Sequence, residues 1–392
     1  MKSGNTILSS YGTTIFEVMS SLAREHGAIN LGQGFPEGLE PPAVMAKAAE
    51  AVMTGPNQYP SMMGIPELRQ AVAAHDQRFH GLDVDWQSEV MVTSGATEAL
   101  ADALFGLIEP GDEVVLIEPL YDSYLPIVRR AGGTVRLVRL EPPDWELPRA
   151  ALAAAFSART KLLLLNNPTN PCGKVYTIED LTFIAELARD HDAIVVCDEV
   201  YEHLVFDGRR HIPLMTLPDM RDRCVRICSA GKSFSLTGWK VGMVVAAPDL
   251  LRPVAKAHQY ITFTTPPNLQ AAVAFGLGLG DDYFTGLVHD MQGRRDTLAA
   301  GLADIGFDVL ACQGSYFLTA DFRALDHRGT DTEFCRRLTI DAGVAAVPVS
   351  AFYTDDAPSH FARFCFAKSN QALDEALARL GRHFGRSRRL VR

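Results

Sequence analysis

Short apolar runs alternate with amphipathic segments through the middle of the chain. The runs are rich in valine, isoleucine and leucine and show no polar alternation; they cover residues 113–118, 161–166, 193–198, 226–231 and 241–247. This pattern predicts strands that are buried on both faces of a mostly parallel sheet. Residues 97–108 and 177–189 carry helix signals, and the second segment opens with a capping threonine followed by acids. The alternating order predicts an α/β, doubly wound large domain over residues 55–285.

The last hundred residues have a different pattern. Residues 314–318 and 361–367 favour strands, whereas residues 331–341 and 370–384 favour amphipathic helices. We therefore expect a smaller α+β domain over residues 286–392. The N-terminal arm, residues 1–54, has a helical pattern at residues 13–25 and is expected to pack on this domain. A helix at residues 283–305 would bridge the two parts.

Composition excludes several classes of protein. Of the 392 residues, 47% are hydrophobic and 21% are charged, as in an ordinary globular chain. The net charge of −10 disfavours a nucleic-acid binder, and the one basic run, residues 386–389, is expected to be solvated. Because the chain starts with polar residues, we expect no signal peptide, and no run approaches the roughly 20 apolar residues of a membrane span. Seven cysteines without a CxxC pair favour reduced thiols in the cytoplasm and indicate no metal site.

Candidate chemistry follows the ends of the predicted strands, where doubly wound sheets bind their ligands. Residues 94–97, Ser-Gly-Ala-Thr, form a strand-to-helix turn that could hold a phosphate on free N–H groups. An ordinary glycine turn capped by Thr97 explains the same residues. Lys232 could be a nucleophilic amine with a depressed pKa, or a surface lysine whose head reaches solvent. Lys240 has the same surface alternative.

Two further charged residues have similar alternatives. Asp198 ends an apolar run and could pair with a protonated ring nitrogen that Tyr201 also reaches, or it could simply cap a helix. Arg363 lies between aromatic residues and could bind a carboxylate with two hydrogen bonds, or form an internal ion pair. A phosphate loop, an aromatic ring, an asparagine, an aspartate and a lysine in this order would together suit pyridoxal phosphate.

With these residues in place, the sequence resembles class I aminotransferases of the fold type I pyridoxal-phosphate superfamily. The resemblance runs from about residue 13 to 380 and is carried by NLGQGFPEG (30–38), NQYP (57–60), SGATEAL (94–100), PLYDSY (119–124), NPTNP (167–171), DEVYEHL (198–204), SAGKSFSLTGWKVG (229–242) and RFCFAK (363–368). The nearest likeness is to methionine or aromatic aminotransferases and to kynurenine/glutamine aminotransferases. Some actinobacterial members of this branch are assigned to N-succinyldiaminopimelate.

The resemblance implies a role for each matched residue. Lys232 would form the Schiff base and shuttle the proton, Asp198 would hold the ring nitrogen, and Tyr201 would hold the phenolic oxygen. The other cofactor contacts that it implies are Gly95, Ala96, Thr97, Tyr121, Asn170, Ser229 and Lys240. The substrate contacts that it implies are Arg363, Asn170 and the backbone of Gly34. Tyr59 would reach the phosphate of a neighbouring subunit, which implies a homodimer with shared sites.

The substrate expectation rests on two departures from relatives. Ile15 stands at about the position where relatives that prefer aromatic substrates often have tryptophan, and no arginine matches the one that binds the side chain of aspartate. Phe263 would come from the partner's loop. We therefore expect an apolar pocket for methionine-like, aromatic or kynurenine-like amino acids, with a 2-oxo acid as acceptor. The alternatives are a carbon–sulfur β-lyase on cysteine conjugates, an N-succinyldiaminopimelate aminotransferase and a non-catalytic cofactor sensor.

Overall fold

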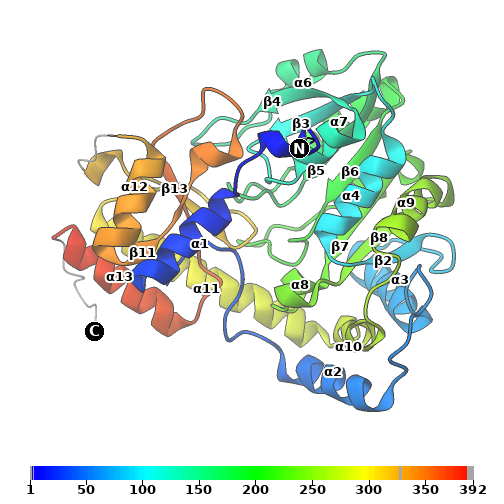
Figure 1. The fold of residues 1–392 in the computed structure, drawn as a ribbon, viewed down its shortest axis with the longest axis horizontal. Coiled ribbons are helices and arrows are strands. Elements are labelled where there is room, and N and C mark those ends of the chain that lie inside the picture. The colour runs from blue at the N-terminus through cyan, green and yellow to red at the C-terminus, as the bar shows by residue number, and fades with distance from the viewer. Residues whose placement is uncertain (1, 3, 326–328, 386–392) are drawn as a thin grey trace.

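A computed structural model describes residues 2, 4–325 and 329–385, so the basic run at residues 386–389 lies outside the described part. The larger part of the molecule is built on one seven-stranded sheet (Figure 1). Its strands, from one edge to the other, are β2 (Val90–Thr93), β8 (Gly242–Ala246), β7 (Cys224–Ser229), β6 (Ile194–Asp198), β5 (Thr160–Asn166), β3 (Glu113–Glu118) and β4 (Thr134–Arg139).

Strand direction agrees with the predicted fold class. The five strands β7, β6, β5, β3 and β4 run parallel to one another, and β8 pairs antiparallel with both β7 and β2. The α/β, mostly parallel sheet is therefore confirmed. The apolar runs predicted five of its strands, and the strand-to-helix turn at residues 94–97 implied β2, whereas the half-exposed edge strand β4 was not predicted.

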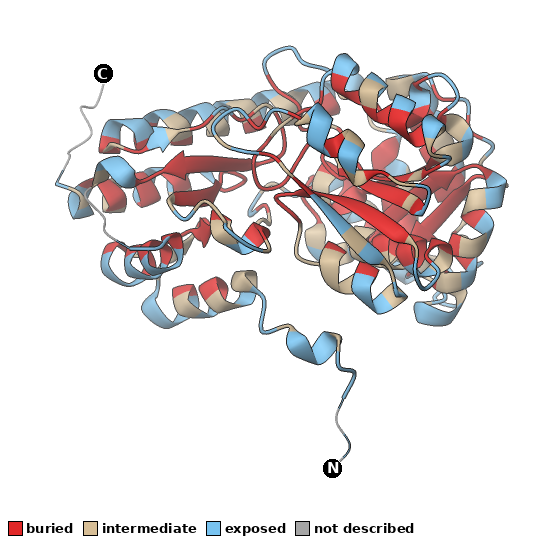
Figure 2. Ribbon diagram, turned by 90° about the horizontal axis from the view of Figure 1, so that it is seen from above, coloured by how far each residue is buried: buried red, intermediate tan, exposed pale blue. Residues whose placement is uncertain are grey.

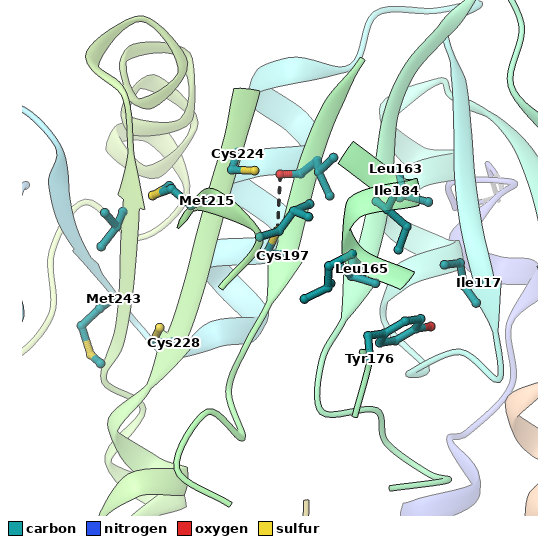
Figure 3. Close-up of a cluster of buried hydrophobic side chains, with 14 of the residues drawn as sticks. Ile117, Leu163, Leu165, Tyr176, Ile184, Cys197, Met215, Cys224, Cys228 and Met243 are labelled. Carbon is teal, nitrogen blue, oxygen red and sulfur yellow. Dashed lines mark hydrogen bonds between the residues drawn. The ribbon is translucent and has the colours of Figure 1, made fainter. Parts of the chain in front are cut away.

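Helices cover both faces of this sheet, as the burial of alternate strand residues requires. Val114, Leu116 and Val196 pack with α4, α5 and α9, and Val115, Leu163 and Val195 pack with α3, α7 and α10. Figure 2 shows the sheet buried between helices whose outer faces are exposed. Figure 3 shows part of the core between the sheet and α3, α7 and α10, where Cys197, Cys224 and Met243 lie among aliphatic side chains. The helices of this part are α2 (Pro42–Thr54), α3 (Pro66–His80), α4 (Ala96–Leu107), α5 (Tyr124–Ala131), α6 (Arg149–Ala155), α7 (Ile178–Asp190), α8 (Ala230–Ser233), α9 (Pro248–Ile261) and α10 (Pro267–Leu277).

A second, smaller group of elements surrounds a four-stranded antiparallel sheet in the order β12 (Val347–Pro348), β13 (Phe361–Cys365), β10 (Phe317–Asp321) and β9 (Asp308–Val309). Strand β1 (Ile29–Asn30) of the N-terminal segment pairs with β11 (Val344–Ala345) beside it. The helices here are α1 (Ile15–His26), α12 (Asp331–Arg337) and α13 (Asn370–His383). Helix α11 (Asp281–Ile305) joins the two parts, because Phe284 packs in the large core and Leu302 in the small one. The domain boundaries at residues 54 and 285 stay predictions.

Two predicted strands are shifted along the chain. The run at 226–231 forms a strand only to Ser229, because α8 begins at Ala230. The strand expected at 314–318 begins at Phe317, because Ser315 has a φ of 66° and cannot join an extended ladder. None of the described helices has the length and apolar character needed to cross a bilayer.

Candidate active site

A cavity of about 380 Å³ opens at the carboxyl ends of the parallel strands. Eleven of the residues predicted from the sequence line it: Gly34, Gly95, Ala96, Thr97, Tyr121, Asn170, Asp198, Tyr201, Ser229, Lys232 and Lys240. They come from turns that follow β2, β3, β5, β6 and β7, from the turn before β8, and from the N-terminal segment. Segments far apart in the sequence therefore meet at one site that is rich in polar and charged side chains.

The turn between β2 and α4 forms one end of the cavity. Gly95 precedes α4 with a φ of 82°, a conformation that side chains rarely tolerate. A Cβ at this position would come within 3.2 Å of Lys240 Nζ. The N-terminus of α4, with its free N–H groups and positive dipole end, and the ammonium of Lys240 therefore face the same space. Such an arrangement suits an anion.

Asp198, the last residue of β6, is buried against the cavity wall. Its Oδ2 accepts a hydrogen bond of 2.5 Å from the Tyr124 hydroxyl. Burial raises the pKa of the Asp198 carboxyl to about 6, an effect that the Tyr124 hydrogen bond opposes. A cationic ligand group that contacts this carboxylate would offset the unfavourable burial.

Lys232, on the short helix α8, points its amine into the same cavity. Its Nζ donates to the Tyr316 hydroxyl at 2.7 Å, and that hydroxyl lies 2.7 Å from the carbonyl oxygen of Gly34. Burial lowers the pKa of Lys232 to about 8, against the attraction of Asp198. With this pKa, roughly a tenth of Lys232 is the neutral, nucleophilic amine at pH 7, far more than for an ordinary lysine.

Arg363, on β13, is buried and contacts Asn170, which lines the cavity. Its Nη1 donates to Asn170 Oδ1 at 2.8 Å, and its Nη2 donates to the Gly32 carbonyl at 2.6 Å. The guanidinium stacks 3.8 Å from the centroid of the Phe317 ring. Among the described residues its Nε, which is buried, finds no hydrogen-bond partner.

Four predicted residues are not among those that line the cavity within a single chain: Arg363, Tyr59, Phe263 and Ile15. Tyr59 is 84% exposed, and its ring packs edge-on against Phe263 at 5.9 Å. Ile15 packs into the apolar core, whereas the adjacent Phe16 ring lies 6.4 Å from that of Tyr121. Their roles in the site stay predictions.

Comparisons with known proteins agree with this geometry. Residues 26–380 match the family described as aminotransferase class I and II. This chain belongs to the class I and II aminotransferases. The solved N-succinyldiaminopimelate aminotransferase of Mycobacterium tuberculosis is 45% identical and superposes with a TM-score of 0.94, covering 96% of this chain and 99% of that one.

Two other relatives support the same assignment. The methionine aminotransferase of Escherichia coli K12 is 40% identical over 94% of this aminotransferase and 95% of its own length. Kynurenine–oxoglutarate transaminase 1 of Mus musculus is 38% identical over 91% of this chain and 92% of its own. The expected family, fold type and transaminase activity are thereby confirmed, and the cofactor is pyridoxal 5'-phosphate.

The residues of this aminotransferase fit that cofactor. The Gly95 turn and Lys240 offer an anion site that an added Cβ would obstruct. The buried Asp198 carboxylate suits a protonated ring nitrogen, and the cavity-facing amine of Lys232 suits an aldehyde. All three groups line the same cavity, as binding of one small cofactor requires.

Sequence reasoning missed several polar groups around the site. Tyr124 belongs to a motif noted in the sequence, but its bond to Asp198 was not predicted; its position three residues after Tyr121 was the only signal. Tyr316 gave no signal beyond its place within the strand predicted at residues 314–318. Arg226 was assigned only to an apolar run, yet it is fully buried on β7 and pairs with Asp76 and Glu199 at 2.6 Å each, and with Glu202.

Proposed function

We propose that this aminotransferase takes the amino group from an amino acid with an apolar side chain, of the methionine, aromatic or kynurenine type, and gives it to a 2-oxo acid. One observation carries the choice of substrate. Arg363 is framed by the rings of Phe16, Phe317 and Phe352, and the cations among the described residues that line the cavity are Lys232 and Lys240. A second substrate carboxylate would have to be desolvated without a partner, which costs several kcal/mol.

The proposed chemistry uses the chain's own groups as follows. Bound pyridoxal phosphate supplies an aldehyde carbon that receives the amino group and a ring that accepts the electrons of the Cα–H bond. Arg363, with Asn170 and the backbone of Gly34, binds the substrate α-carboxylate. Lys232 Nζ, as the neutral amine, would take the proton from the substrate Cα and deliver it to the cofactor carbon that carried the aldehyde. Asp198 keeps a proton on the ring nitrogen, so that the ring stays electron-poor.

The remaining cavity residues hold the cofactor in this proposal. Lys232 is the point of Schiff-base attachment, Tyr121 stacks on the ring, and Tyr201 and Asn170 bind its phenolic oxygen. The phosphate is bound by Gly95, Ala96, Thr97, Ser229 and Lys240. The positions of these residues on the cavity wall support the assignment.

We also propose a homodimer in which Tyr59 and Phe263 complete the partner's site, with Ile15 near the substrate. Exposed apolar side chains support the association. Large side chains on α2, on the segment after it, at the end of α9 and on α10 are accessible: Met53 (83%), Tyr59 (84%), Tyr260 (80%), Phe263 (43%) and Phe275 (41%). Large exposed apolar side chains that contact one another, as Tyr59 and Phe263 do, are typical of interaction surfaces. The seven free, buried cysteines support the cytoplasm as the location.

The similarity to the Mycobacterium tuberculosis enzyme favours N-succinyldiaminopimelate as a second candidate donor. A carbon–sulfur β-lyase is the third possibility, because it would use the same cavity. The donors are compared directly by following the absorbance of the bound cofactor as it decreases in a single turnover. The donors tested are methionine, phenylalanine, kynurenine, aspartate and N-succinyldiaminopimelate. We expect methionine and one aromatic donor to exceed aspartate in kcat/KM by about tenfold or more.

Product analysis completes this test. A keto acid together with a new amino acid identifies transamination, whereas pyruvate with ammonia from a cysteine conjugate identifies lyase activity. If aspartate or N-succinyldiaminopimelate is the best donor, the apolar assignment is wrong. The partner subunit would then be the place to look for the missing cation.

A further inference from the structure

Tyr316 lies between the lysine of the cavity and the N-terminal segment. It precedes β10 and is fully buried. Its hydroxyl is 2.7 Å from Lys232 Nζ and 2.7 Å from the Gly34 carbonyl oxygen. Two functional groups that are 198 positions apart in the sequence are therefore joined through one oxygen atom.

The direction of both hydrogen bonds follows from the donors available. The Gly34 carbonyl can only accept, so the single O–H proton of Tyr316 points to Gly34. The hydroxyl oxygen is then left as an acceptor, and Lys232 must be the donor. The Tyr316 ring is held edge-on by Tyr201, at 5.1 Å, and by Phe317, at 4.8 Å. The oxygen is consequently a fixed point for the free amine of Lys232.

We propose that Tyr316 is a positioning residue for transamination: it holds the free amine of Lys232 where the amine exchanges the proton, and it ties that position to Gly34. The inference rests on the proposed role of Lys232. A lysine side chain has several rotatable bonds, and burial alone does not choose among its rotamers. A fixed acceptor restricts the amine to one place, as efficient proton transfer requires.

The test compares Tyr316→Phe with the wild-type holoenzyme. The phenylalanine ring keeps the packing against Tyr201 and Phe317 and removes only the hydroxyl. We expect kcat to fall by about tenfold to a hundredfold, while KM changes little, because the loss affects the proton-transfer step. Tyr353→Phe is the matched control: Tyr353 is also buried and donates to a backbone carbonyl, that of Leu140, away from the cavity.

A second readout does not depend on turnover. The holoenzyme is converted to its amino form with excess donor, which leaves Lys232 free, and is labelled with trace acetic anhydride at several pH values. Peptide mass spectrometry then gives the titration of this one amine. Because the hydroxyl oxygen favours the charged ammonium, Tyr316→Phe should lower the midpoint by about half a unit to one unit. A merely structural role would leave the midpoint unchanged.

The outcomes separate this inference from the proposed function. If Lys232→Ala retains turnover, the role of Lys232 itself is wrong. If Lys232→Ala is inactive but Tyr316→Phe matches Tyr353→Phe in kcat and in labelling midpoint, only the positioning role is refuted. If Tyr316→Phe does not fold, 3-fluorotyrosine at position 316 serves instead: it is a weaker acceptor, so a midpoint that does not fall refutes the proposal.

Discussion

Replacing Arg363 by lysine tests how the substrate carboxylate is recognised. The wild-type guanidinium donates from Nη1 to Asn170 and from Nη2 to Gly32, and its Nε has no partner among the described residues. A lysine ammonium keeps the charge but carries its donors on a single atom, without the planar fork. Arg363→Lys therefore separates geometry from charge.

The expected magnitude follows from these contacts. Lysine cannot hold Asn170, Gly32 and a carboxylate in the positions that the fork defines, so at least one charge-assisted hydrogen bond is lost. Such a bond contributes about 1.5–3 kcal/mol, which corresponds to a loss of about 10- to 150-fold in kcat/KM. We expect the loss for every amino donor, because each has an α-carboxylate.

The control is Arg295→Lys. Arg295 also stacks on a phenylalanine, Phe206 at 5.1 Å, and donates to a side chain, Asp207, and to a backbone carbonyl, that of Cys312. It lies outside the cavity, so its loss should change the free energy of unfolding but leave kcat/KM near wild type. Steady-state kinetics and urea unfolding of both variants decide the matter. Equal kcat/KM for Arg363→Lys and the wild type would refute the role in carboxylate binding.

Two further predictions concern buried charge. Asp198→Asn should keep the fold and its contact with Tyr124 but lower kcat by more than about tenfold, and a smaller loss would contradict the ring-nitrogen role. Burial disfavours charged His258, but the carboxylates of Asp102, 3.5 Å from its Nδ1, and Glu98, 2.7 Å from its Nδ1, outweigh burial and raise its pKa from 6.5 to about 9. The stabilisation is therefore present below pH 6.5 and lost as pH rises through 9. Between pH 7 and 9.5, above the pKa of about 6 of Asp102, the free energy of unfolding of the wild type should fall by about 2 kcal/mol relative to that of His258→Gln, a difference in which the titration of Lys232 cancels. His258→Gln should remove this dependence; an unchanged slope would exclude His258 as its source.

Much of the large sheet could be predicted from the sequence, because its central strands are apolar on both faces and stand out without alternation. The helix cap at Thr177 was equally local: its side chain accepts from the backbone N–H of Asp180, as the sequence suggested. The edge strand β4 was missed for the opposite reason. Several of its residues are exposed, and its polar composition hides it.

The contacts around the site were harder to predict because they are set by tertiary packing. The hydroxyl of Tyr316 meets Lys232 only because β10 and α8 converge on the cavity. The buried partners of Arg226 come from α3 and from the segment after β6, and no spacing in the sequence relates them. Local patterns identify which residues end a strand. They do not say which distant side chain completes a hydrogen bond.

The single antiparallel strand explains how two lysines reach one cavity. Parallel strands end at the same edge of a sheet, so Asp198 and Ser229 lie there together, with Lys232 just beyond. An antiparallel strand begins at that edge, and Lys240 stands two residues before β8. The register places Gly242 opposite both Ser229 and Thr93. A Cβ on Gly242 would lie 2.6 Å from the backbone of Gly95, so this glycine permits the close approach of the anion-binding turn. The reversal of one strand thus brings Lys240 to the same side of the sheet as Lys232.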